Sequence, residues 1–168
     1  RTQDEGRPKV QAARDAMRAL NPYVEITPLE RRVTQADRAL IAEHDLVIDG
    51  TDSFAARAQI NAACAAAGVA LVAGAIAQWE GQLTVWDPAR GAPCMACVFP
   101  DAPAPGLAPP CAEAGVVGAL PGVVGSLMAL EALKDARARS NASVDDIWRF
   151  AKICRVANVM RPYLEAVE

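Results

Sequence analysis

The chain has few aromatic residues, one histidine and no surplus of positive charge. Phe, Trp and Tyr make up 5% of its 168 residues, so the sequence offers no aromatic platform on which bases could stack. Its 17 lysines and arginines stand against 20 aspartates and glutamates, giving a net charge of -3. That balance argues against a surface that binds nucleic acid or an anionic membrane.

Long hydrophobic runs are also missing. No uninterrupted apolar run approaches the ~18 to 20 residues that a membrane helix needs, and the charged N-terminal segment lacks the apolar core of a signal peptide. The five cysteines form an odd number, and Cys94 and Cys97 have Cys-x-x-Cys spacing. We therefore expect a cytoplasmic protein whose cysteines serve metal or thiol chemistry rather than a disulfide framework.

Segments of helical and strand-like pattern alternate along the chain, which predicts βαβ units and one α/β domain. Apolar spacing, proline and glycine positions predict helices over residues 9–20, 34–43, 55–68 and 123–134. Short apolar or alternating runs predict strands over residues 24–28, 46–48, 69–72 and 82–87, the last of which could run antiparallel.

The remaining segments are expected to be irregular or separate from this domain. Residues 90–110 are rich in proline, so we expect a long loop of functional importance or high mobility. Residues 1–134 form the expected domain, residues 135–142 a polar linker, and residues 143–168 a helical tail of unknown role.

An acidic turn follows the strand predicted at residues 46–48. It reads Asp49-Gly50-Thr51-Asp52 and leads directly into the next helix. Because ligands of open α/β sheets bind at the carboxyl ends of parallel strands, this turn is a candidate site on physical grounds alone.

The residues around this turn resemble a known family. The pattern Asp49-x-x-Asp52-x-x-x-x-Arg57-x-x-x-Asn61 is similar to that of the ThiF/MoeB/HesA family of ubiquitin-activating-like adenylyltransferases. Two later blocks agree with it, in order, as the Cys94-x-x-Cys97 pair and the segment from Cys111 to Glu131. The resemblance covers roughly residues 6–134.

This resemblance implies a Rossmann-like, mostly parallel sheet with flanking helices, incomplete at its N-terminus. The G-x-G-x-x-G turn that cradles ATP phosphates in the family is absent from the sequence. The implied activity is ATP-dependent adenylylation of the C-terminal glycine of a ubiquitin-like sulfur carrier, ThiS-like or MoaD-like, for thiamine or molybdopterin synthesis. A homodimer is also implied. The alternative is a catalytically inactive protein-binding or dimerisation module derived from this family.

The resemblance also assigns roles to individual residues near the turn. Asp52 would bind Mg²⁺ beside the ATP phosphates, although it could instead only cap the following helix. The remaining nucleotide contacts would come from Lys9, Ser53, Arg57 and Asn61. Ser53 stands where the family usually has asparagine, and Lys9 could alternatively be a solvated helix terminus. Asp49 is expected to order the turn rather than to bind metal.

The cysteines allow several interpretations. Cys94 and Cys97 have the spacing of a zinc half-site, but a structural Zn²⁺ needs four ligands, so they could equally be two reduced thiols. Cys111 stands where some members carry the cysteine that reacts with the activated carrier, and other members activate their partner without it. Cys64 is expected in the core, and His44 at the surface.

Overall fold

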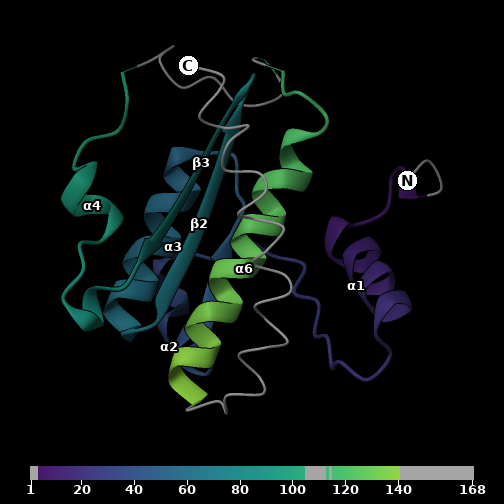
Figure 1. The fold of residues 1–168 in the computed structure, drawn as a ribbon, viewed down its shortest axis with the longest axis horizontal. Coiled ribbons are helices and arrows are strands. Elements are labelled where there is room, and N and C mark those ends of the chain that lie inside the picture. The colour runs from purple at the N-terminus through teal and green to yellow at the C-terminus, as the bar shows by residue number, and fades with distance from the viewer. Residues whose placement is uncertain (1–3, 105–112, 114, 141–168) are drawn as a thin grey trace. The chain divides into compact units, whose positions relative to one another are not determined.

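The computed structural model describes residues 4–104, 113 and 115–140, which divide into two units, residues 1–33 and 34–168 (Figure 1). The first unit contains one helix. The second contains a three-stranded sheet and its flanking helices. In chain order the elements are α1 (Lys9–Leu20), η2 (Gln35–Asp37), α2 (Arg38–Ala42), β1 (Leu46–Asp49), α3 (Phe54–Ala67), β2 (Ala70–Ala77), β3 (Glu80–Trp86), η3 (Pro88–Arg90), α4 (Met95–Val98) and α6 (Leu120–Ser140).

The first unit is built around α1, which has the bounds that the sequence predicts. Pro8 precedes it, where a missing N–H costs nothing, and Arg7 forms ion pairs of 2.6 Å with both Asp4 and Asp15. The prediction of a strand at residues 24–28 is wrong, because this segment has no regular structure. A strand needs a neighbour for its backbone N–H and C=O groups, and no described strand pairs with it.

The sheet of the second unit has the strand order β1-β2-β3. Strands β1 and β2 pair in parallel, with Leu46 opposite Ala70 and Asp49 opposite Ala73. Strands β2 and β3 pair antiparallel, as the alternating pattern of β3 suggested. The central strand β2 is almost entirely apolar because it is covered on both faces, and this confirms the expected mixed α/β fold class.

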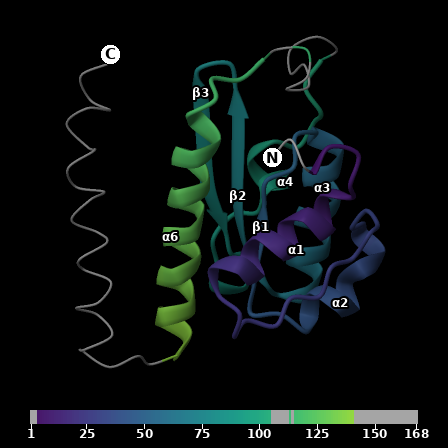
Figure 2. The same ribbon diagram turned by 90° about the vertical axis from the view of Figure 1, so that its right-hand side faces the viewer.

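Helix α6 covers one face of the sheet, and α3 lies on the other (Figures 1 and 2). Val124 and Met128 of α6 are buried against Val72 of β2, and each such side chain contributes about 1.5 to 3 kcal/mol on burial. Gly74 permits this close packing. A Cβ atom there would lie 2.2 Å from Sδ of Met128.

Helix α3 begins and ends with local signals that are visible in the sequence. The Ser53 side chain accepts a hydrogen bond from the Ala56 N–H at 3.2 Å, which makes Ser53 the N-cap. Gly68 ends the helix in the left-handed conformation, at φ 72°, where a side chain would be strained. Between these ends Ile60, Ala63 and Cys64 are buried.

The segment after β3 is less irregular than the sequence suggested. Within residues 90–104 it contains the single helical turn α4, and residues 105–110 lie outside the described part of the chain. On its return the chain is tied to the tip of the β2–β3 hairpin. There the Gln78 N–H donates to the Gly115 carbonyl at 3.0 Å, and the Val117 N–H donates to the Gln78 carbonyl at 2.9 Å.

Helix α6 is longer than predicted, because it starts three residues earlier and continues through Ser140. Residues 135–140, expected to begin a linker, are therefore helical. Asp135 forms an ion pair of 3.2 Å with Arg90, which holds this part of α6 near the end of β3. The tail expected at residues 143–168 lies outside the described residues. Among the described helices, none combines the length and apolar character that crossing a membrane requires.

Candidate functional site

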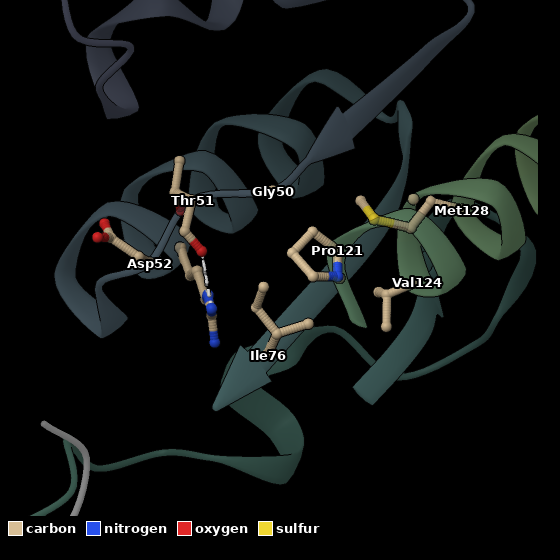
Figure 3. A pocket seen from close by; sticks show the side chains of 10 residues that line it. Gly50, Thr51, Asp52, Ile76, Pro121, Val124 and Met128 are labelled. Atoms are coloured by element: carbon tan, nitrogen blue, oxygen red, sulfur yellow. Dashed lines mark hydrogen bonds between the residues drawn. The ribbon is translucent and has the colours of Figure 1, made fainter. Parts of the chain in front are cut away.

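A cavity of about 250 Å³ opens at the carboxyl end of β1 in the second unit (Figure 3). One wall is polar and comes from the turn after β1 and from α3; the other is apolar and comes from β2 and α6. Figure 3 shows Thr51 and Asp52 on one side, Val124 and Met128 on the other, and Ile76 between them. The lining residues are Gly50, Thr51, Asp52, Arg57, Gly74, Ile76, Pro121, Val124, Gly125 and Met128.

The turn between β1 and α3 is fixed by hydrogen bonds on both sides of Thr51. Its N–H donates to Oδ1 of Asp49 at 2.8 Å, which confirms that Asp49 orders the turn. Its carbonyl oxygen accepts from Nε and Nη2 of Arg57, at 3.0 and 2.7 Å. Ser53 then caps α3. The backbone is therefore held immediately before and after Asp52.

Asp52 is an exposed residue that lines the cavity, and Figure 3 draws its carboxylate pointing away from Ile76 and Val124, toward solvent. The expectation that it could serve only as a helix cap is wrong, because Ser53 occupies that role. Within the described residues its carboxylate accepts no hydrogen bond and forms no ion pair, so both oxygens are available to a ligand. A carboxylate of this kind suits Mg²⁺, which binds through one or two carboxylates and keeps several waters.

The other predicted nucleotide contacts are only partly brought together. Arg57 lines the cavity and also holds Thr51, whereas the Ser53 hydroxyl is engaged in capping. Asn61 is 4% exposed, does not line the cavity, and accepts a hydrogen bond from the Met95 N–H at 2.9 Å. Lys9 is the exposed first residue of α1 in the first unit. The roles of these residues toward a nucleotide stay predictions.

Two buried oxygens in the turn have no hydrogen-bond partner among the described residues. They are Oδ2 of Asp49, whose residue is 2% exposed, and Oγ1 of Thr51. Because burying an unpaired polar atom is costly, such atoms mark a place where water or another group completes the structure. Both lie in the turn that carries Asp52.

A smaller cavity, of about 50 Å³, shares Arg57 and Gly74 with the first. It is lined on its other sides by Trp86 of β3 and by Met95 and Phe99 of the α4 segment. Strand β1 ends at Asp49, opposite Ala73, while β2 continues to Ala77. Arg57 lines both cavities, which lie beside the part of β2 that extends beyond β1.

The apolar wall of the larger cavity was not identified from the sequence. Val124 and Met128 fit the pattern of a helix packed on a sheet, and nothing local marks them as lining a cavity. The signal that could have indicated this wall is the pair of glycines Gly122 and Gly125 in α6, because glycine lets a ligand approach the helix backbone closely.

The Cys94 and Cys97 thiols lie 3.5 Å apart at α4. Burial raises the pKa of Cys94, but hydrogen bonds from Cys97, the Asn61 side chain and the Ala96 backbone outweigh it, so the pKa is lowered. No third metal-ligating side chain joins them among the described residues. The two thiols alone do not complete a tetrahedral zinc site.

Two of the remaining candidates, Cys64 and His44, lie where the sequence predicts. Cys64 is a core residue, as expected; burial, and secondarily the charge of Asp49, raises its pKa to about 11. His44 is exposed, with Nδ1 2.9 Å from the Leu40 carbonyl oxygen, as expected for a surface residue. Cys111, the candidate nucleophile, lies outside the described residues.

The chain is similar in sequence to a known protein family and to several adenylyltransferases. The profile of the ThiF family matches residues 1–158. Molybdopterin-synthase adenylyltransferase of Escherichia coli is 49% identical over 130 residues, which are 77% of this chain and 51% of the relative. Sulfur carrier protein adenylyltransferase of Thermus thermophilus is 44% identical over 138 residues, 79% of this chain and 51% of the relative.

A third relative is named for a different carrier. Sulfur carrier protein ThiS adenylyltransferase of E. coli is 40% identical over 134 residues, 79% of this chain and 53% of the relative. The chain thus spans about half the length of these curated relatives.

Proposed function

The chain belongs to the ThiF family, and from that premise we propose that the full-length protein activates a ubiquitin-like sulfur carrier with ATP. The carrier's C-terminal glycine carboxylate attacks the α-phosphate, AMP becomes attached to the carrier, and pyrophosphate leaves. The activated carrier then receives sulfur for thiamine or molybdopterin synthesis. Relatives named for both kinds of carrier support the class of substrate.

One observation supports this proposal most directly. Asp52 lines a cavity at the carboxyl end of β1, and its carboxylate has no hydrogen bond or ion pair with the described residues. Mg²⁺ bound there would offset negative charge on the ATP phosphates, and positioned charge is the main source of catalysis in phosphoryl-type transfer. Asp52 would supply one oxygen ligand, and the hydrogen bonds at Thr51 hold the backbone next to it.

The second wall of the cavity suits the other substrate. Gly74 and Gly125 present no side chains, while Ile76, Val124 and Met128 present apolar ones. An extended tail of small residues could lie against this wall with its carboxylate directed toward the polar side. Orienting the carboxylate in this way would convert a reaction between separate molecules into one within a complex.

Three further assignments belong to the same proposal. We expect a cytoplasmic location, and a homodimer as the family resemblance implies. We expect Cys111 to react with the activated carrier. Zinc would bind at Cys94 and Cys97 only if other parts of the full-length protein supply the remaining ligands.

Carrier-dependent exchange between ATP and radioactive pyrophosphate tests the proposal in the full-length protein. ThiS-like and MoaD-like carriers are assayed separately, each beside a variant that lacks its terminal glycine. Exchange that requires the glycine supports adenylylation and identifies the carrier. Carrier binding without any exchange would instead favour the non-enzymatic protein-binding module.

A further inference from the structure

The sequence pattern places Arg57 among the residues that contact the nucleotide, but its guanidinium is already engaged within the protein. Nε and Nη2 both donate to the Thr51 carbonyl oxygen, at 3.0 and 2.7 Å. A hydrogen bond from a charged donor is about twice as strong as a neutral one, so this contact is a substantial restraint on the turn.

Thr51 is held from its other end as well. Its N–H donates to Oδ1 of Asp49, a residue that is 2% exposed and anchored at the end of β1. Asp49 of β1 therefore binds the Thr51 N–H, and Arg57 of α3 binds the Thr51 carbonyl oxygen. The next fixed point along the chain is the Ser53 cap.

Asp52 is the residue between these fixed points. Its own side chain makes no contact with the described residues that would hold it, so its position depends on the backbone around it. Gly50, two residues before Asp52, has open space around it and permits many backbone conformations. Without the two bonds from Arg57, the turn is free to reorient and to move Asp52 relative to the cavity.

We infer that Arg57 is a positioning residue, which fixes the Thr51 carbonyl and with it the backbone that carries Asp52 beside the cavity. Its main task is then not to anchor the nucleotide. The catalytic consequence rests on the proposed function, but the restraint on the turn does not. Arg57, in the first turn of α3, also lines both cavities.

Amide hydrogen exchange of residues 50–53 tests the restraint without any substrate. In the full-length protein, Arg57→Gln removes the paired donors, and Arg57→Lys keeps the charge with a single donor group. Arg38→Gln is the matched control, because Arg38 is exposed at the start of α2, away from the turn. We expect roughly tenfold faster exchange in Arg57→Gln, as loss of the charge-assisted hydrogen bonds to the Thr51 carbonyl allows, and an unchanged exchange rate in the control.

Kinetics then separate positioning from nucleotide binding. For Arg57→Gln we expect the Mg²⁺ concentration that half-saturates pyrophosphate exchange to rise roughly tenfold, because Asp52 is misplaced. The KM for ATP at saturating Mg²⁺ should stay within about twofold of wild type, since uniform binding is retained. If Arg57→Gln does not fold, Arg57→Lys carries the same comparison with smaller effects.

Two results would overturn the inference. One is unchanged hydrogen exchange of residues 50–53 in a folded Arg57→Gln protein. The other is a raised KM for ATP with an unchanged Mg²⁺ requirement, which is the behaviour of a direct nucleotide contact. Failure of the wild-type protein to exchange pyrophosphate with any carrier would refute the proposed function instead, and with it only the catalytic consequence of the restraint.

Discussion

Replacing Asp52 with asparagine separates a catalytic role of this residue from a structural one. The two side chains have nearly the same shape, so the change removes a negative charge and little else. Asp52 is exposed, and its carboxylate has no partner among the described residues. The change should therefore alter the free energy of unfolding by no more than about 0.5 kcal/mol, the usual range for such surface positions.

The effect on rate should be far larger. Mg²⁺ binds through charged oxygens, and loss of one preorganised electrostatic group lowers rates by about 10² to 10³, or roughly 2.7 to 4 kcal/mol of transition-state stabilisation. We therefore expect carrier-dependent ATP–pyrophosphate exchange by the full-length Asp52→Asn protein to fall by that factor. The melting temperature should stay unchanged.

The neighbouring residue provides a control with the opposite behaviour. Ser53→Ala removes the N-cap of α3 and should lower the free energy of unfolding by about 1 kcal/mol. Exchange activity of the folded protein should fall far less than in Asp52→Asn, because the charge at residue 52 remains and only the predicted Ser53 contact with the nucleotide is lost. If Asp52→Asn retained exchange within about threefold of wild type, with unchanged stability, the turn after β1 would not be the active site.

Three other predictions concern packing and thiols. Gly74→Ala should destabilise the protein by about 1 to 3 kcal/mol in urea unfolding, because the new Cβ atom overlaps Met128 and forces its side chain to move; unchanged stability would contradict the packing of α6. At pH 8 a maleimide should modify Cys94 and Cys97 before the buried Cys64, as mass spectrometry of the labelled protein can show. Burial raises the pKa of Cys64 from about 9.0 in the unfolded chain to about 11 in the folded protein. Between these pH values the unfolded chain loses the thiol proton and the folded protein keeps it, so the free energy of unfolding should decrease as the pH rises from about 9.0 to about 11. This decrease should be smaller in Cys64→Ala, which has no thiol at this position.

The elements with strong local signals could be predicted from the sequence. Helix α1 has the predicted bounds, and the core strands, the antiparallel β3 and the glycine-terminated α3 lie where apolar spacing and cap residues indicate. The family pattern identified the turn at Asp52 as the candidate site. These features depend on neighbouring residues, so they are readable from a short window of sequence.

Features that depend on distant partners could not be read in this way. The strand predicted at residues 24–28 is absent, since strand formation requires pairing that its own residues do not supply. The cavity's apolar wall arises because Gly74 lets Met128 of α6 approach β2, a contact between segments more than fifty positions apart.

The site itself shows the same division. The sequence by itself determined which polar residues follow β1, and it suggested Asp52 as a possible cap for α3. Only the tertiary structure decided that Ser53 is the cap, that Arg57 bonds to the Thr51 carbonyl, and that Asn61 turns toward Met95. The physical reason is that the donor and acceptor groups of each side chain could form hydrogen bonds with several different partners. Which partner it takes depends on the positions of α3, β1 and α4 in space.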